Sequence, residues 1–444
     1  MSLPAPRLRD RPAVLLTLAI IVLAGAGLRG WQAAHPRLAH ESVDERVYSA
    51  LAQTLAEDLH YGDRSTGPRH PFIAAPGAPF AFAAARRLTP SPPDSPTDIP
   101  AAYWLLAVVG TLLIPATFAL GRRLGGNGAG LVAAVVVAVY PPLVRTTGEL
   151  LSEPLGALPL ALAVLALLAA RSSGRRVLFA AGGALLGVAA LARADLLVAV
   201  LACPLLLLGL AAARGRSRAG LVEAATVLAA GALVIAPWVA YASGRSGALV
   251  PVVDTDAPTL LVGAYLPGDG TVVGFKRSLA DETRARMPEL RGRSDAQMPG
   301  AAVMETVRAR RPDLSYRDAL RAEAFANVRR YAVGHPAAFV AMMGRKAVRM
   351  WRQPSQVRSP AAGAMHAVVV GLAVAGLLCG LLWGRRGDVL LVTSVILAST
   401  LLHSVLVAHP RYALPLIALL AAGGASGLSA AWAKRAGRNA PARP

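Results

Sequence analysis

The sequence predicts an all-α integral membrane protein, a bundle of about ten transmembrane helices with a partly helical loop domain on the extracytoplasmic side. Of its 444 residues, 55% are hydrophobic and only 16% are charged, and the mean hydropathy is +0.49. These values lie far from those of soluble domains. Apolar runs also recur along the chain with lengths near the ~20 residues that cross a bilayer. Basic residues lie mostly between these runs.

The first apolar run, from about residue 13 to residue 28, follows a basic N-terminal segment with Arg7, Arg9 and Arg11. This pattern predicts a signal anchor whose N-terminus faces the cytoplasm. A cleavable signal peptide is the alternative, because Ala24-Gly-Ala26 is a possible cleavage site. In both cases the following loop, 31–100, is expected to be extracytoplasmic.

Nine further apolar segments give the expected topology. They span about 101–121, 128–144, 150–170, 177–192, 195–213, 219–242, 364–384, 387–408 and 411–432. Alternate loops are then basic, as the positive-inside rule requires of cytoplasmic loops. These loops contain Arg122-Arg123, Arg171 with Arg175-Arg176, 214–218, Arg385-Arg386 and Lys434-Arg435. We therefore expect both termini in the cytoplasm.

This topology divides the chain into four parts. Residues 1–242 form an N-terminal membrane region that includes loop 31–100, and residues 243–362 form an extracytoplasmic loop domain. Residues 363–434 form a C-terminal membrane region, and 435–444 a basic cytoplasmic tail. Within the loop domain we expect the first half, rich in Pro, Gly and Asp, to be irregular.

Two helices are expected in the second half of the loop domain, at Tyr316–Tyr331 and Pro336–Trp351. The second combines Phe339 and several methionines with Arg345 and Lys346. Such a pattern is typical of a helix in the lipid headgroup layer or of an amphipathic helix packed on protein.

Composition also bears on partners and cofactors. Lys and Arg number 46 against 25 Asp and Glu, a net charge of +21. Because the basic residues lie between apolar segments, we assign them to helix orientation and anionic lipid and expect no nucleic-acid partner. Cys203 and Cys379 lie inside apolar runs, which excludes a disulfide framework or a cysteine metal site. We expect no metal and no cofactor.

The segment from Ser42 to Leu51 carries the first candidate catalytic group. Ser42 and Glu45 form a capping-box pattern that predicts a helix start, with Asp44 in its first turn. Tyr48 shares a helix face with Leu51. The helix dipole favours an ionised Asp44, as a proton acceptor requires. The alternative is that Asp44 and Glu45 only stabilise the helix start.

Ionisable residues gather at the expected outer ends of the membrane segments. They are Asp44, Glu45, His70, Arg145, Glu149, Glu153, Arg193, Asp195, His409 and Arg411. Charge near hydrocarbon is costly and usually functional. We interpret the group as one site, with carboxylates to act as a base and cations to neutralise a phosphate. The alternatives are local: Arg193 and Asp195 pair, Glu149 and Glu153 start a helix, and Arg411 anchors at the interface.

Several short motifs, taken in order, resemble the GT-C superfamily of membrane glycosyltransferases that use polyprenyl-phosphate sugars. The likeness is strongest to its branch of protein O-mannosyltransferases, the lipid A aminoarabinose transferase and RgtA/B/C/D-like enzymes. The motifs are Asp44-Glu45-x-x-Tyr48, His70-Pro with Pro76-Gly-x-Pro79, Ser152-Glu-Pro-Leu155, Gly187 to Arg193, Ala236-Pro-Trp238, Tyr331 to Trp351 and Arg411-Tyr-Ala-Leu-Pro415. His-Pro-Phe replaces the commoner His-Pro-Pro.

The resemblance implies a GT-C-like bundle with Asp44 as the catalytic carboxylate and Glu153 as a second acid beside it, with Glu45 grouped with them. Arg193 is implied as a contact to the donor phosphate. His70 stands where the aminoarabinose transferase has a lysine, and a neutral imidazole binds phosphate less well. Tyr48, Glu149 and Arg411 complete the expected substrate-binding residues.

The expected function is the transfer of a mannose-like or arabinose-like sugar from a polyprenyl-phosphate sugar to a glycan, lipid or protein acceptor outside the membrane. Asp44 would act as the general base. A transporter or flippase of a polyprenyl-linked substrate is the alternative, and an assembly protein with a degenerate site is a third reading. Transporters tend to carry ionisable residues near mid-span, whereas here they gather at the outer ends.

Overall fold

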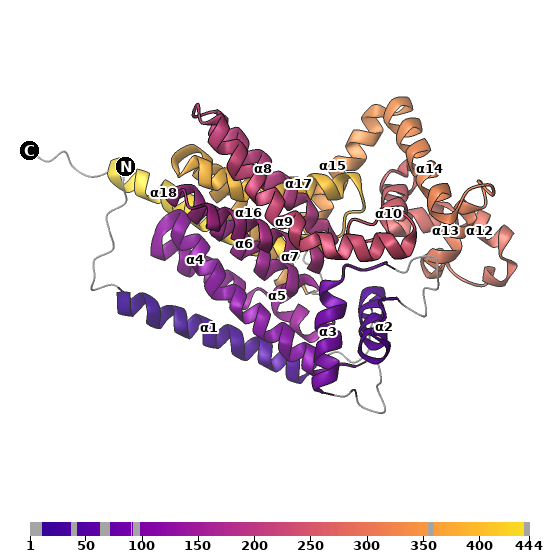
Figure 1. Ribbon diagram of the computed structural model, residues 1–444, viewed down its shortest axis with the longest axis horizontal. Helices are drawn as coiled ribbons and strands as arrows, with labels where there is room; N and C mark the ends of the chain where they lie inside the picture. The colour runs from indigo at the N-terminus through magenta and orange to yellow at the C-terminus, as the bar shows by residue number, and fades with distance from the viewer. Residues whose placement is uncertain are drawn as a thin grey trace, which may run out of the picture.

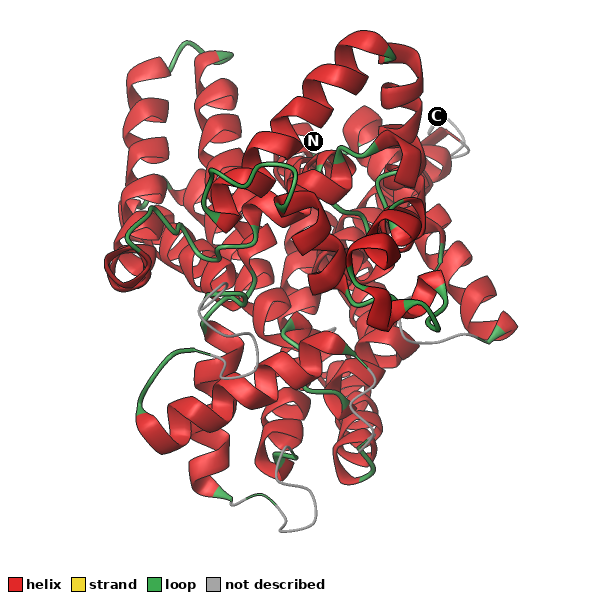
Figure 2. Cartoon of the chain, turned by 90° about the vertical axis from the view of Figure 1, so that its right-hand side faces the viewer, coloured by secondary structure: helices red, strands yellow, loops and turns green. Residues whose placement is uncertain are grey.

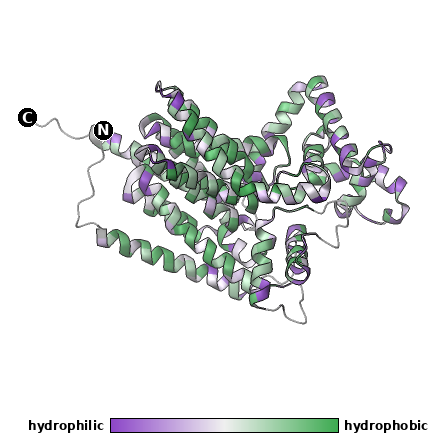
Figure 3. Cartoon of the chain, viewed as in Figure 1, coloured by the Kyte–Doolittle hydropathy of each residue, from purple (hydrophilic) through white to green (hydrophobic). Residues whose placement is uncertain are grey.

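The computed structural model describes residues 11–36, 42–62, 72–89, 91, 98–353 and 359–438. Within these ranges every regular element is helical, as the sequence predicts (Figures 1 and 2). Apolar residues dominate the long helices of the bundle, and polar residues concentrate at their ends and in the domain on the right of Figure 3. The chain is a multi-pass membrane protein.

Nine helices form the membrane bundle of the described residues. They are α1 (Arg11–Ala34), α4 (Pro100–Val139), α6 (Glu153–Ser173), α7 (Arg176–Ala192), α8 (Leu197–Ala212), α9 (Ser217–Ser246), α16 (Pro360–Trp383), α17 (Arg386–Val405) and α18 (Ile417–Arg438). All except the 17-residue α7 are long and apolar enough to cross a membrane. Short elements connect them: α5 (Pro141–Arg145), η3 (Thr146–Gly148), η4 (Ala194–Leu196) and η9 (Pro410–Leu416).

Helix α4 consists of two helices joined at Gly126. Gly126 has φ +87°, a left-handed conformation that favours glycine. The chain doubles back at this point, as the close approach of its two sides shows: a Cβ added to Gly121 would lie only 3.0 Å from the carbonyl oxygen of Ala129. In a continuous helix residues 121 and 130 would be roughly 13 Å apart. Counted this way, the described bundle has ten apolar segments, which agrees with the sequence prediction.

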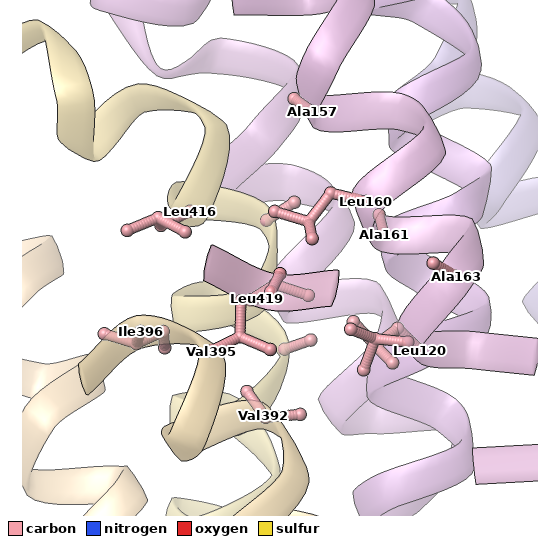
Figure 4. Packing of buried hydrophobic residues seen from close by; sticks show 14 of the residues in the cluster. Leu120, Ala157, Leu160, Ala161, Ala163, Val392, Val395, Ile396, Leu416 and Leu419 are labelled. Atoms are coloured by element: carbon pink, nitrogen blue, oxygen red, sulfur yellow. The ribbon is translucent and has the colours of Figure 1, made fainter. Parts of the chain in front are cut away.

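The bundle core is formed by α4, α6, α7, α8, α17 and α18. Figure 4 shows how leucine, valine and alanine side chains of α4, α6, α17 and α18 pack together in it. Leu160 of α6 and Leu419 of α18 are fully buried there. Glycines bring helices into close contact: Gly376 of α16 lies directly against Gly424 and Gly427 of α18, with no room for a side chain. Small residues at such crossings are the usual way that membrane helices approach one another.

Two short helices follow α1: α2 (Val43–Asp58) and α3 (Gly77–Leu88). The predicted capping box is confirmed, since the Ser42 side chain accepts a hydrogen bond from the Glu45 amide and the Glu45 carboxylate accepts one from the Ser42 amide. Tyr48, Leu51 and Leu55 are buried on one face of α2, as expected. They pack with α3 in a separate apolar cluster that includes Tyr103 and Trp238. This packing fixes α2, and with it Asp44, against the bundle.

The residues between α9 and α16 form a second helical domain, which we call the outer domain. Its described part contains six helices: α10 (Asp256–Gly263), α11 (Val272–Ser278), α12 (Ala280–Arg286), α13 (Gly300–Arg308), α14 (Tyr316–Val328) and α15 (Pro336–Arg352). Short turns join them: η5 (Leu266–Gly268), η6 (Pro288–Leu290), η7 (Asp295–Gln297) and the π-turn η8 (Arg329–Val333). The expected helices α14 and α15 are confirmed. The methionines Met342 and Met350 of α15 are fully buried, so this face packs on protein.

The expectation that the first half of this domain is irregular was wrong. Leu261, Phe275 and Val303 come from three short helices and pack with Leu320 of α14 into a core of their own. Helices of seven to nine residues are too short to show a clear period in the sequence. Tertiary packing therefore stabilises helices that local composition does not favour.

Candidate active site

A cavity of about 810 Å³ lies between the ends of the membrane helices and the outer domain. Its walls come from α2, α8, α14, α17 and η9 and from the 248–256 segment. The side chains that line its polar part are Asp44, Tyr48, Ser152, Arg193, Asp195, His403, Arg411 and Tyr412. These residues are far apart in the sequence, and the fold alone brings them together.

Asp44 stands at the start of α2, and its side chain is 48% exposed. Its Oδ2 atom forms an ion pair with the guanidinium of Arg411, which is 367 positions away in the chain. Arg411 is fixed by the proline-containing turn η9, where its backbone amide donates to Nδ1 of His409 at 3.2 Å. The candidate base and a candidate phosphate ligand therefore lie side by side.

Glu153 occupies the centre of the ionic contacts. It begins α6, directly before Pro154, and its side chain is fully buried. It forms ion pairs with Arg411 and with Nη1 of Arg193, the latter at 3.2 Å. Arg193 in turn pairs through Nε with Asp195 at 3.1 Å. We call the continuous series Asp44, Arg411, Glu153, Arg193 and Asp195 the charge chain.

Arg193 directly follows α7 as its C-cap and is almost completely buried. Its Nη1 atom also donates to the hydroxyl of Ser152 at 3.2 Å, and this hydroxyl lies 3.1 Å from that of Tyr48. Although burial opposes it, the carboxylates of Asp195 and Glu153 hold the pKa of Arg193 above its usual value. Burial, reinforced by Asp44, raises the pKa of Tyr48 to about 12. At neutral pH Arg193 is charged and Tyr48 keeps its proton.

His403, on the final turn of α17, also lines the polar part of the cavity. Its Nε2 atom lies 3.6 Å from Oδ2 of Asp195, and its ring stacks on that of Tyr412 with 4.2 Å between centroids. Sequence reasoning did not identify His403, although an ionisable residue inside an apolar segment is a recognised signal of function.

The other expected residues are placed differently. Glu45 is turned away from the cavity: it caps Ser42 and accepts from the amide of Leu150 at 3.3 Å, which ties α2 to the segment before Glu153. Glu149 is buried and pairs with Arg145 at 3.1 Å. Neither lines the cavity. His70 lies outside the described residues.

The rest of the cavity has two kinds of wall. Along the membrane it is apolar, with Leu197, Val198 and Leu201 of α8 facing Leu402 and Leu406 at the end of α17. Leu201 is 55% exposed, so this wall continues onto the outside of the bundle. Toward the outer domain the rim is polar and contains Thr255, Asp256, Thr259, Arg317, Asp318 and Arg321. A molecule with an apolar chain and a polar, charged head fits this division.

A second cavity, of about 860 Å³, lies among α2, α3, α7 and α9 and is lined almost entirely by apolar side chains. Its charged residue, Arg87, donates to the carbonyl of Ala56 at 3.0 Å. Chemistry that needs a base and cations therefore belongs to the first cavity. Among the residues with a described position, no group of three or more His, Cys, Asp or Glu side chains is arranged to hold a metal ion.

Comparison of the sequence with protein-family models and with curated proteins finds no match. Its fold is similar to that of the oligosaccharyltransferase AglB from Archaeoglobus fulgidus. The AglB structure with an inhibitory peptide and a dolichol-phosphate aligns with a TM-score of 0.55 and 14% identity, over 99% of this chain and 53% of AglB. The AglB structure with a tethered acceptor peptide aligns with a TM-score of 0.53 and 14% identity, over 97% and 51%.

The chain thus spans about half the length of AglB. ArnT from Cupriavidus metallidurans, bound to undecaprenyl phosphate, aligns at 14% identity over 93% of this chain and 77% of ArnT, but its TM-score of 0.41 is too low to support an argument. The likeness to AglB confirms the GT-C-like membrane fold that the sequence predicts.

Proposed function

We propose that this protein is a membrane glycosyltransferase that moves a sugar from a polyprenyl-phosphate sugar to an acceptor hydroxyl at the extracytoplasmic face. One observation carries the proposal: an accessible carboxylate, Asp44, lies in the same cavity as the guanidiniums of Arg193 and Arg411. The likeness in fold to AglB, whose structure contains a dolichol-phosphate, supports a lipid-linked donor.

The donor fits the two-part cavity. Its phosphate would lie near Arg193 and Arg411, because guanidinium groups bind phosphate oxygens through paired, charge-assisted hydrogen bonds. The polyprenyl chain would follow the apolar wall of α8 and α17, at Leu201 and Leu406. This orientation places the sugar toward Asp44 and the outer rim.

Transfer then requires one proton acceptor and one stabilised leaving group. The acceptor hydroxyl attacks the anomeric carbon and gives its proton to Asp44. The new C–O bond forms as the bond to the lipid phosphate breaks, and the phosphate leaves with the electron pair. We assign the proton to Oδ1, because Arg411 contacts Oδ2. Arg193 and Arg411 stabilise the departing phosphate, and such preorganised electrostatic stabilisation is usually a large part of catalysis.

Glu153 has a different role in this mechanism from that of a second acid. Its carboxylate is fully buried and does not line the cavity, so it does not reach the substrate. It instead holds Arg193 and Arg411 at a fixed separation. We therefore propose Glu153 as a positioning residue that preorganises both cations.

The acceptor would enter past the outer domain, where Arg317 and Arg321 of α14 both pair with Asp256 at the cavity rim. Alternating carboxylates, guanidiniums and hydroxyls can bind the hydroxyl groups of a glycan, which donate and accept in turn. With the positive-inside topology, both termini would lie in the cytoplasm and this rim would lie outside.

The test is to incubate membranes that contain the protein with radiolabelled polyprenyl-phosphate sugars and to follow the label into extractable fractions. We expect label in a new acceptor fraction with the native protein and a strong decrease with Asp44→Asn. Asp281→Asn is the matched control, since Asp281 is fully exposed on α12. Label that crosses the bilayer while still lipid-linked, with no transfer, would identify a transporter instead.

A further inference from the structure

The hydrogen bonding of His403 determines where its proton lies. Its Nδ1 atom is 2.8 Å from the carbonyl oxygen of Ser399. A carbonyl only accepts, so Nδ1 carries a hydrogen. In a neutral ring Nε2 then carries a lone pair, and this atom faces Oδ2 of Asp195 at 3.6 Å. Two acceptors oppose each other unless a second proton on Nε2 makes the ring cationic.

The charge chain explains why a second proton is useful. It contains three carboxylates against two guanidiniums, an excess of one negative charge, and Glu153 and Arg193 within it are almost fully buried. A polyprenyl phosphodiester would bring one more negative charge. In a poorly solvated site such an excess is costly unless it is compensated.

The other charged groups around His403 do not supply this compensation. Arg193 is already paired with Asp195 and Glu153. The ammonium of Lys346, on α15, also interacts electrostatically with the ring. It is held by hydrogen bonds that it donates to the carbonyls of Gly263 at 2.9 Å and Val405 at 3.2 Å. Tyr412 of η9 presents its ring face. Below pH 8 Lys346 already carries its proton, so His403 is the group at this end of the cavity that can gain a positive charge there.

We propose that His403 takes up a proton when the donor phosphate binds. The imidazolium pairs with Asp195, and Arg193 is released from Asp195 to bind the phosphate. The inference rests on the proposed function, since it concerns the donor of that reaction. His403 acts through Asp195 and Arg193 and is therefore a positioning residue.

Two features of the structure suit a cationic ring at this place. His403 lies in the last turn of α17, where the helix dipole favours positive charge. The face of Tyr412 is stacked on it and can stabilise a cation. In the protonated state both ring nitrogens have partners, Ser399 and Asp195.

The test uses a ligand that does not titrate, the methyl phosphodiester of a C15 polyprenol, which carries one negative charge throughout the pH range. Its binding to the full-length protein in detergent is measured by calorimetry from pH 5.5 to 7.5, in two buffers with different heats of ionisation. We expect uptake of about one proton per ligand at the upper end of this range. The Kd should become smaller by up to about tenfold per pH unit as the pH falls.

The decisive variant is His403→Asn, because its amide can replace the Nδ1 hydrogen bond to Ser399. We expect it to bind the ligand with no proton uptake and with a Kd independent of pH. His409→Asn is the matched control, since His409 is the neighbouring histidine and accepts from the amide of Arg411. It should keep the native pH dependence.

Each other result decides against the inference in a different way. Ligand binding that does not depend on pH would overturn the role of His403 and leave the proposed donor standing. Proton uptake that persists in His403→Asn and disappears in His409→Asn would do the same. Failure of the ligand to bind at any pH would overturn the proposed donor, and this inference with it. If His403→Asn does not fold, Asp195→Asn takes its place. Removal of that carboxylate removes the excess charge, so proton uptake should fall below half, and undiminished uptake would refute the inference.

Discussion

Glu153 and Asp269 are two carboxylates that each contact two arginines, one in the bundle and one in the outer domain. Glu153 is fully buried, and its partners Arg193 and Arg411 are 4% and 13% exposed. Asp269 is 38% exposed, and its partners Arg345 and Arg349 are 54% and 35% exposed. The two carboxylates have the same kind of partners but differ in their exposure to solvent.

The difference in exposure separates two roles of carboxylate–arginine ion pairs, one at the surface and one in the protein interior. An exposed ion pair contributes about 0–1 kcal/mol to stability, so the Asp269 contacts add little more than local order on α15. A buried network has to recover several kcal/mol of desolvation for each ion. Because hydrophobic side chains could stabilise the same place at lower cost, we infer that the charge chain is kept for its chemistry.

The largest effect is expected from Asp44, the exposed end of the charge chain. Asp44→Asn removes the proton acceptor while keeping the shape of the side chain and the helix start. We expect transfer to decrease by about 10²–10⁴-fold, the usual contribution of a positioned base. Asp269→Asn should leave the rate unchanged. Most of the native activity in Asp44→Asn vesicles supplied with donor would show that Asp44 is not the base.

Arg193→Met tests the buried part of the comparison. Methionine keeps much of the volume of the arginine stem, which packs against Gly156. The variant leaves Asp195 without its guanidinium and Glu153 with one arginine instead of two. Loss of a buried partner costs about 3–5 kcal/mol. We expect a matching decrease in thermal stability in detergent, together with weaker donor binding. Unchanged donor affinity would remove Arg193 from the phosphate site.

Lys346 connects the two regions, since its ammonium donates hydrogen bonds to backbone carbonyls at the end of α10 and at the end of α17. Burial lowers its pKa to about 8. Below pH 8 the ammonium is charged in both the folded and the unfolded chain, and its burial lowers stability by about 3 to 4 kcal/mol at most. Between pH 8 and about 10.5 the folded chain loses this proton before the unfolded one does, so the penalty disappears as the pH rises.

Lys346→Met has no such proton to lose. We therefore expect the difference in melting temperature between the native protein and Lys346→Met to shift in favour of the native protein from pH 8 to 10.5. A difference that stays constant over this range would show that the pKa of Lys346 is the same in the folded and the unfolded chain, as it would be for a solvated ammonium.

The sequence predicts features that depend on near neighbours. Ser42 and Glu45 are three residues apart, so their capping box could be identified, and the ten apolar segments follow from local composition. The sequence also placed Asp44, Glu153, Arg193 and Arg411 at one membrane level. Their roles remain predictions.

Contacts between distant residues could not be predicted in this way. Asp44 and Arg411 are 367 positions apart, and nothing local determines that their helix ends face each other. The sequence did not indicate His403, because this residue lies in an apolar run. Its partner Asp195 is only two residues from Arg193, so the sequence suggests a local ion pair instead. The helices α10 to α13 were missed because their stability depends on a shared core.

The smallest effect is expected for Arg345→Met, the exposed counterpart of Arg193→Met. Asp269 keeps Arg349, and both are partly solvated, so stability should change by less than about 1 kcal/mol. This small change should vanish in 1 M salt, where charges are screened beyond ~3 Å. The penalty of Arg193→Met should persist, because salt ions do not reach a buried carboxylate. If both variants respond to salt alike, the charge chain is solvated, and burial does not distinguish the two regions.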